Sequence, residues 1–167
     1  EVIFLAVDPD IAITAIIGKT IADADSLIRA ISAVEGVERA MPVVEDNALA
    51  IFADFSMPLK LKGVPVDYHL LTGVDSVVVE GEFLLQDEVS RYAVLGVGPA
   101  VNLNARPGSL RMLNLYAPQR RGQVDLNDPL NAFTEDSVFV SGVFMVKQKT
   151  YDNELVYVPI DLARGLF

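Results

Sequence analysis

His69 is the only histidine of the chain, and the sequence contains no cysteine. These two counts exclude Cys–His catalysis and zinc sites built from thiolates or several histidines. A Ser–His–Asp triad would have to use His69 as its base. Its neighbours Tyr68, Leu70 and Leu71 instead predict a partly packed loop residue.

One stretch begins like the glycine fingerprint that binds dinucleotides: Gly96-Val97-Gly98-Pro99-Ala100-Val101. Val101 stands where the third glycine belongs, and Pro99 interrupts the motif. We interpret the stretch as a strand end that turns into a short helix. No complete phosphate-binding loop with both of its glycines occurs either. We therefore expect no cofactor.

Acidic side chains stand in neighbouring pairs that could bind calcium, because carboxylate oxygens are its preferred ligands. None of the pairs has the spacing of a known calcium loop. In a chain with 23 acidic and 13 basic side chains, we interpret them as solvated turn residues and expect no metal. The pairs are Asp8/Asp10, Glu45/Asp46, Asp87/Glu88 and Glu135/Asp136.

Two short stretches could contact a partner protein. Arg120 and Arg121 lie in a polar segment, and a pair of guanidinium groups can clasp a carboxylate. The alternative is that they only keep a loop tip soluble. Phe55 and Met57 could form an exposed apolar tip, or that tip could fold back onto the domain.

The composition limits the classes of partner. The net charge of −10 argues against nucleic acid and against a basic patch on an anionic membrane. Hydrophobic residues make up 51% of the chain, which is ample for a packed core. No apolar run reaches the roughly 18 residues of a membrane span, and we see no signal peptide. Because the chain starts at Glu1 and stops after Leu166-Phe167, we expect it to be part of a longer protein.

The first part of the chain alternates strand and helix patterns. Residues 11–17 are apolar and have strand length. Apolar residues recur at helical spacing within 27–34, which predicts a helix that Asp23 or Asp25 caps and Gly36 ends.

Shorter strands and turns follow. Residues 48–52 and 59–63 predict a hairpin around 54–58, and the alternation of leucine and lysine in its second arm predicts one wet face. Further strands are expected at 77–79, 92–96 and 110–116, a short helix at 99–104, and an exposed loop at 117–131.

The last thirty residues carry the strongest local signals. Residues 138–146 are rich in Val and Phe at both the odd and the even positions, which face opposite sides of a strand. This pattern predicts a strand that is covered on both faces. Residues 147–153 predict a polar turn, and 155–158 a second strand antiparallel to the first, closed by Pro159. A short helix capped by Asp161 completes this predicted buried hairpin. The whole pattern is typical of the α+β class.

An ordered set of turn and packing signatures resembles a known family. The set consists of Gly18-Lys19, Val34-Glu35-Gly36-Val37, Ala48-Leu49, Gly73-Val74-Asp75, Gly81-Glu82-Phe83, Ser141-Gly142-Val143-Phe144, Tyr151-Asp152 and Val158-Pro159-Ile160-Asp161-Leu162-Ala163. It resembles the extracytoplasmic core domain of MacB-like and FtsX-like ABC transporter permeases, most closely in the style of Bacteroidetes members. Arg106-Pro107-Gly108 stands where lipoprotein-releasing members carry a Gly-Asp turn.

The resemblance implies a fold and a function. The expected fold is a strand-helix, porter-like lobe at 1–63 and 135–167 with a β-rich lobe inserted at 64–134. The expected protein is not an enzyme. It couples ATP-driven motion to export, or hands on a lipoprotein or peptide, as part of a membrane protein at the periplasmic face of the inner membrane. Its expected partners are the rest of the permease, the ATPase subunit, a second permease copy and a periplasmic protein, lipoprotein or peptide.

Two other hypotheses remain open at this point. A small soluble hydrolase would use His69 with a serine and an acid. A free-standing protein-binding module would have no membrane link.

Overall fold

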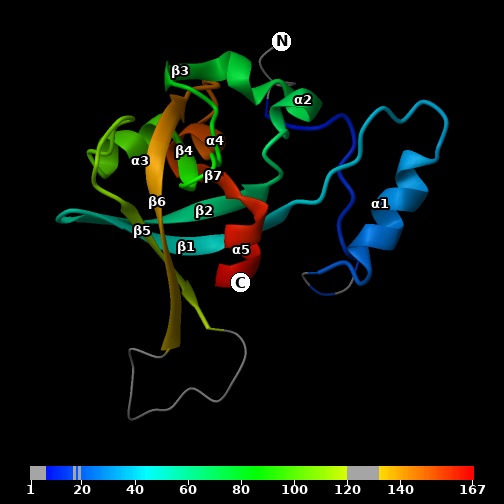
Figure 1. Ribbon diagram of the computed structural model, residues 1–167, viewed down its shortest axis with the longest axis horizontal. Coiled ribbons are helices and arrows are strands. Elements are labelled where there is room, and N and C mark those ends of the chain that lie inside the picture. Colours follow the sequence, from blue (N-terminus) through cyan, green and yellow to red (C-terminus); the bar gives the residue numbers. More distant parts are fainter. Residues whose placement is uncertain (1–6, 17, 19, 120–131) are drawn as a thin grey trace.

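The structure, a computed structural model, describes residues 7–16, 18, 20–119 and 132–167 (Figure 1). In that part of the chain, one sheet contains the strands β1 (Val44–Phe52), β2 (Phe55–Val64), β3 (Val78–Gly81), β4 (Tyr92–Gly96), β5 (Leu113–Pro118), β6 (Phe133–Phe144) and β7 (Leu155–Pro159). The helices are α1 (Ala24–Ser32), α2 (His69–Thr72), the 3-10 helix η2 (Val74–Val77), α3 (Val97–Asn102), α4 (Lys149–Glu154) and α5 (Ile160–Leu166). This mixture confirms the α+β class. None of the described helices has the length and hydrophobicity that crossing a membrane requires.

The strands close into a ring. β2 pairs with β1 as an antiparallel hairpin and with β7 in parallel, and β4 lies between β7 and β6. β5 then joins β1 to the first half of β6. Because β6 pairs with β5 over residues 133–138 and with β4 over 139–144, the sheet returns on itself, while β3 adds to the end of β6. Ring closure pairs strand edges that would otherwise be open to other chains.

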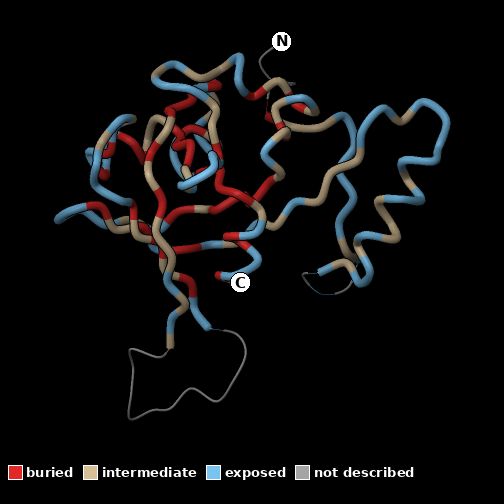
Figure 2. Tube along the Cα trace, viewed as in Figure 1, coloured by how far each residue is buried: buried red, intermediate tan, exposed pale blue. Residues whose placement is uncertain are grey.

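The main core fills the ring. Along β1 the side chains of Ala48, Ala50 and Phe52 point inward and are buried, as the two-residue period of a strand requires. Helix α5 contributes to the same core, and a Cβ atom at Gly63 would collide with the Cβ atom of Ala163. The missing side chain at Gly63 therefore lets α5 approach β2 closely. Figure 2 shows the buried positions concentrated in the ring strands.

A second core lies against β7 and the end of β6. Its largest members, Tyr68, Phe144 and Tyr157, are fully buried. The Tyr157 ring stands edge-on to that of Phe144, with 5.4 Å between ring centroids, and lies 6.0 Å from that of Tyr68. Such tilted arrangements are the favourable ones for aromatic rings. Val7 packs into this cluster from the N-terminal side.

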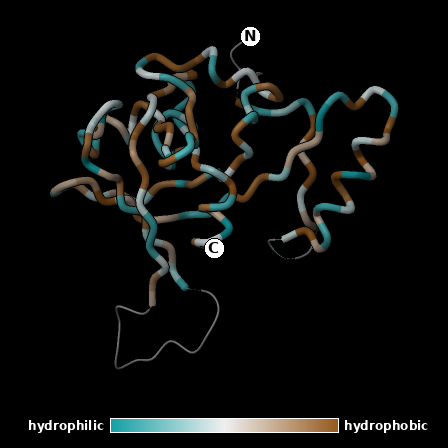
Figure 3. The backbone as a smooth tube through the Cα atoms, in the orientation of Figure 1, coloured by the Kyte–Doolittle hydropathy of each residue, from teal (hydrophilic) through white to brown (hydrophobic). Residues whose placement is uncertain are grey.

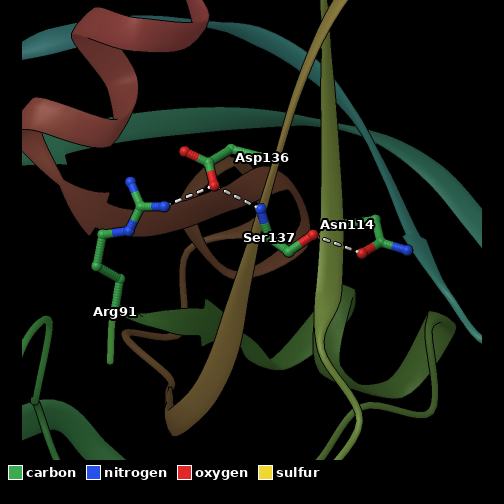
Figure 4. A network of polar contacts seen from close by, with 4 residues as sticks. All are labelled: Arg91, Asn114, Asp136 and Ser137. Atoms are coloured by element: carbon green, nitrogen blue, oxygen red, sulfur yellow. Dashed lines mark hydrogen bonds and ion pairs between the residues drawn. The ribbon is translucent and has the colours of Figure 1, made fainter. Parts of the chain in front are cut away.

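A polar network fixes the point where β6 passes from β5 to β4 (Figure 4). Arg91 donates to the Asp136 carboxylate at 2.7 Å, and the backbone N–H of Ser137 donates to the same carboxylate at 2.8 Å. The Ser137 hydroxyl donates to Asn114 Oδ1 at 2.8 Å. Arg91 directly precedes β4 and Asn114 lies in β5, so the network holds together the three strands that close the ring.

Several predicted elements are confirmed. The hairpin forms, although its turn is only Ala53-Asp54, with Ala53 at φ 54°, and residues 55–58 already belong to β2. The strand at 92–96 is β4, and the helix expected at 99–104 is α3.

The predicted buried hairpin at the end of the chain is wrong. β6 and β7 do not pair, because β4 lies between them. Helix α4 replaces the expected polar turn and gives the chain the length to step across β4, and its Asp152 accepts the Val146 N–H at 2.7 Å. α5 forms as expected, but its N-cap is Pro159. The Asp161 side chain makes no cap bond and instead forms an exposed ion pair with Arg164 at 3.7 Å.

The strand predicted near the N-terminus is also wrong. Residues 11–16 run without regular structure, and most of them are exposed. Helix α1 forms, and Asp23 caps it by accepting the Ser26 N–H at 3.4 Å, but the helix ends at Ser32 with Ala33 as its C-cap and not at Gly36 as predicted. Yet α1 has no buried residue and stands apart from the ring (Figure 1). Figure 3 shows that hydrophobic and hydrophilic residues alternate along α1 and the segments next to it.

The predicted lobes contribute strands to one sheet. The range 1–63 contains β1 and all but the last residue of β2, and the range 64–134 contains β3, β4 and β5. The range 135–167 contains β7 and most of β6, which begins at Phe133. The lobe boundaries stay a prediction.

Candidate functional site

A pocket of about 170 Å³ opens beside the N-terminal segment, where the outer face of the hairpin meets α4 and the start of β7. Charged and polar side chains dominate its walls. The lining residues are Asp8, Glu45, Lys60, Lys62, Thr150, Tyr151, Glu154 and Leu155.

Lys62 is the unusual member of this pocket, because only 7% of the residue is exposed. Its Nζ atom lies over two aromatic rings, 5.6 Å from the centroid of Tyr68 and 5.9 Å from that of Tyr157. Cations bind favourably to such ring faces. Burial lowers the pKa of Lys62, and the charges of Glu45 and Asp8 oppose this shift in part.

Two tyrosines tie the N-terminal segment to this site. The Tyr151 hydroxyl donates to Asp8 Oδ2 at 2.7 Å, and the Tyr157 hydroxyl donates to the Val7 carbonyl at 3.4 Å. The hydrogen bond to Asp8 and burial raise the pKa of Tyr151 to about 12. Burial raises the pKa of Tyr157 well above its usual value. Both phenols therefore stay protonated as donors at neutral pH.

The polar side chains of the site bind different segments of the chain to one another. Negative charges on Asp8, Glu45 and Glu154 face positive charges on Lys60 and Lys62, and Lys60 pairs with Glu45 at 3.4 Å. Among the described residues, no three His, Asp or Glu side chains gather closely enough to hold a metal ion.

Sequence reasoning missed Lys62. The alternation of leucine and lysine in β2 predicted a wet face, and this prediction is wrong at Lys62, whose face the second core covers. Lys60, one pleat earlier, is half-buried and reaches solvent as predicted. The difference arises because the rings of Tyr68, from the turn after β2, and of Tyr157, from the paired strand β7, lie against the Lys62 ammonium. The local pattern carries no signal for this cover.

His69 lies away from the pocket, at the start of α2. Its ring packs against Phe83, with centroids 6.0 Å apart, and its buried Nδ1 has no hydrogen-bond partner within the described ranges. No serine or carboxylate in those ranges is hydrogen-bonded to the ring. His69 is partly packed as predicted, although it begins a helix rather than lying in a loop.

The glycine stretch serves packing. Gly96 ends β4, and α3 follows, as interpreted from the sequence. A Cβ atom at Gly96 would lie 2.6 Å from the Asp152 carbonyl oxygen, and one at Gly98 would lie 2.6 Å from Asn153 Cα. These glycines let α3 and β4 approach the backbone of α4, so α4 occupies the space in front of them.

The acidic pairs do not all lie in turns as predicted, because Glu45/Asp46 belong to β1 and Glu135/Asp136 to β6. Asp87 accepts the Val89 and Ser90 N–H groups at 2.8 and 2.7 Å and the Tyr92 hydroxyl at 2.7 Å. The Tyr92 bond and the two backbone bonds lower the pKa of Asp87. Asp136 holds the network of Figure 4.

The predicted partner residues are only partly placed. Phe55 opens β2 opposite Phe52 and is 48% exposed, whereas Met57 packs partly against the ring core. Arg120 and Arg121 lie outside the described residues.

The comparisons with known proteins begin with two negative results: no protein-family model matches the sequence, and no curated protein matches it. Among solved structures, the chain is similar to the extracellular domain of the noncanonic ABC-type transporter YknZ from Gram-positive bacteria. The identity is 17% and the TM-score 0.56, over 84% of this chain and 64% of that chain. It is also similar to the periplasmic region of MacB from Actinobacillus actinomycetemcomitans, at 14% identity and TM-score 0.49, over 81% of this chain and 54% of that chain. The chain thus spans less than two thirds of the length of either protein chain. It has the fold of the YknZ extracellular domain, as the MacB-like resemblance predicted.

Proposed function

We propose that this chain is a non-catalytic, extracytoplasmic domain of an ABC transporter permease. The observation that carries the proposal is the fold shared with the YknZ extracellular domain, at TM-score 0.56. The described site agrees with a binding or coupling role, because its charged side chains hold segments of the chain together. No base, nucleophile and acid are hydrogen-bonded into a triad around His69 in the described ranges.

In this role the domain couples ATP-driven motion to export, or to the handling of a lipoprotein or peptide, through protein contacts. Its partners are the remaining permease, the ATPase subunit, a second permease copy and a periplasmic protein, lipoprotein or peptide. Phe55 is one of the contact residues that we propose, because it is exposed beside the turn of the hairpin formed by β1 and β2. Met57, Arg120 and Arg121 are the further contact residues that we propose.

Labelling in intact cells tests the location. Asp54→Cys places one thiol at the exposed hairpin turn of a chain that has no cysteine of its own. In the full-length protein, freed of other cysteines, we expect a membrane-impermeant maleimide to label this thiol without cell lysis.

Ala50→Cys, fully buried on the same hairpin, is the matched control and should react only after denaturation. If the Asp54→Cys thiol reacts only after the cells are lysed, the domain is cytoplasmic and the proposal is wrong.

A further inference from the structure

We propose that residues 7–10 form an N-terminal strap that closes over the buried amine of Lys62, and that the hydrogen bond between Tyr151 and Asp8 holds the strap shut. The inference goes beyond the proposed function and does not depend on it.

The strap meets the core over a very short length. Val7 is 1% exposed and belongs to the second core, and Asp8 is half-buried. From Asp10 onward the chain turns outward: Ile11 is 78% exposed and Ile16 is fully exposed. The described contact of the strap therefore consists of one buried side chain and two side-chain hydrogen bonds, from Tyr151 and Tyr157.

Lys62 lies beneath this contact. Asp8 and Lys62 line the same pocket, and the negative charge of Asp8 acts on the lysine ammonium. The rings of Tyr68 and Tyr157 also lie against the ammonium. Lifting the strap would remove the cover and one of the compensating charges at the same time. A desolvated lysine would then face solvent.

A contact of this size opens readily. Local openings with few buried apolar contacts have much smaller free energies than global unfolding. In the described ranges 11–16 and 20–43 no residue is buried, and α1 stands apart from the ring (Figure 1). The strap is thus a two-position element whose closed position depends on Asp8 and Tyr151.

The test is the rate at which a water-soluble acylating reagent modifies Lys62, read by peptide mass spectrometry with half-exposed Lys60 as internal reference. In the wild type we expect Lys62 to react more slowly than Lys60. In Tyr151→Phe we expect the Lys62 rate to rise about fivefold, the equilibrium shift that corresponds to one lost hydrogen bond. This variant keeps the charge of Asp8, so the rise cannot come from removing that charge.

Asp10→Ala is the matched control. It removes one carboxylate from the same strap, but Asp10 is exposed, and the Lys62 rate should stay at the wild-type value. Circular dichroism confirms that each variant is folded. If Tyr151→Phe does not fold, Asp8→Ala replaces it, with faster hydrogen exchange of the strap amides as the expected result. An unchanged Lys62 rate in folded Tyr151→Phe, unchanged strap exchange in Asp8→Ala, or an equal rise in Asp10→Ala overturns the proposal.

Discussion

Replacing Gly142 with valine is expected to destabilise the domain by about 3 kcal/mol or more, the upper range for overpacking a closed core. Gly142 lies in β6 opposite Gly81 of β3, and a Cβ atom there would collide with the backbone carbonyl oxygen of Glu82. A backbone atom cannot rotate away as a side chain can. The pairing of β3 with β6 would have to separate, and the midpoint of urea unfolding should fall sharply.

Gly165→Ala is the matched control for this variant. Gly165 lies in α5, and a Cβ atom there meets nothing within 4 Å. Alanine in a helix is favoured over glycine by about 0.5–1 kcal/mol, so the same urea assay should show a small gain. Equal losses in both variants would mean that the crossing of β3 and β6 is not closely packed.

The domain is expected to unfold steeply above pH 10 because two buried tyrosines cannot ionise in place. Burial raises the pKa of both Tyr68 and Tyr157 far above the ordinary value of 10.0. A phenol whose folded pKa is raised contributes stability that is complete below pH 10 and is lost as the unfolded form ionises above it. Each phenol then costs about 1.4 kcal/mol per pH unit, so both together remove about 4 kcal/mol by pH 11.5.

Lys62 acts with the opposite sign and at lower pH. Its folded pKa is lowered from 10.5, so the cost of burying its charge is relieved as the pH rises towards 10.5. Stability should therefore rise slightly before it falls. Chemical denaturation followed across the alkaline range, together with the ultraviolet absorbance of the phenolates, measures both effects.

Tyr68→Phe separates the tyrosine effect from general alkaline damage. The buried Tyr68 hydroxyl has no hydrogen-bond partner among the described residues. Its removal should stabilise the domain by about 1 kcal/mol at pH 7 and by about 2 kcal/mol more at pH 11.5. Tyr157→Phe loses a bond to Val7 and should gain less at pH 7. If Tyr68 or Tyr157 ionised with a midpoint near pH 10 in the folded protein, this account would be contradicted.

The elements that could be predicted are those that short patterns determine. The helical spacing of apolar residues, with a cap at Asp23 or Asp25, predicted α1. The stretches 48–52 and 59–63 predicted the hairpin, although the predicted turn at 54–58 was too long. β4 could be predicted because Tyr92–Gly96 is apolar and ends at a glycine.

Strand order could not be read in the same way. The apolar faces of β6 and β7 show that both strands are buried, but not which strand lies beside each. β4, which comes earlier in the chain, pairs with both, and closure of the ring depends on contacts such as Arg91 with Asp136. Residues 11–16 show that an apolar run is not sufficient for a strand. This run has no sheet partner among the described strands and has no regular structure.

The site was hidden for a similar reason. The sequence drew attention to residue types with known chemistry, such as His69 and the glycines at 96 and 98, and the structure uses these in packing. Lys62 and Tyr151 line one pocket together with Asp8, which comes from the other end of the chain from Tyr151, and no local pattern shows that these residues meet.

The most direct test of the proposed coupling is a distance measured across the assembled transporter. Spin labels at Asp54→Cys report the separation of the hairpin turns in two permease copies by pulsed electron paramagnetic resonance. In full-length protein reconstituted in lipid, we expect the distance distribution to shift when ATP is bound to a hydrolysis-deficient ATPase subunit. The same distribution with and without bound ATP would contradict the proposal that this domain moves with the ATPase cycle.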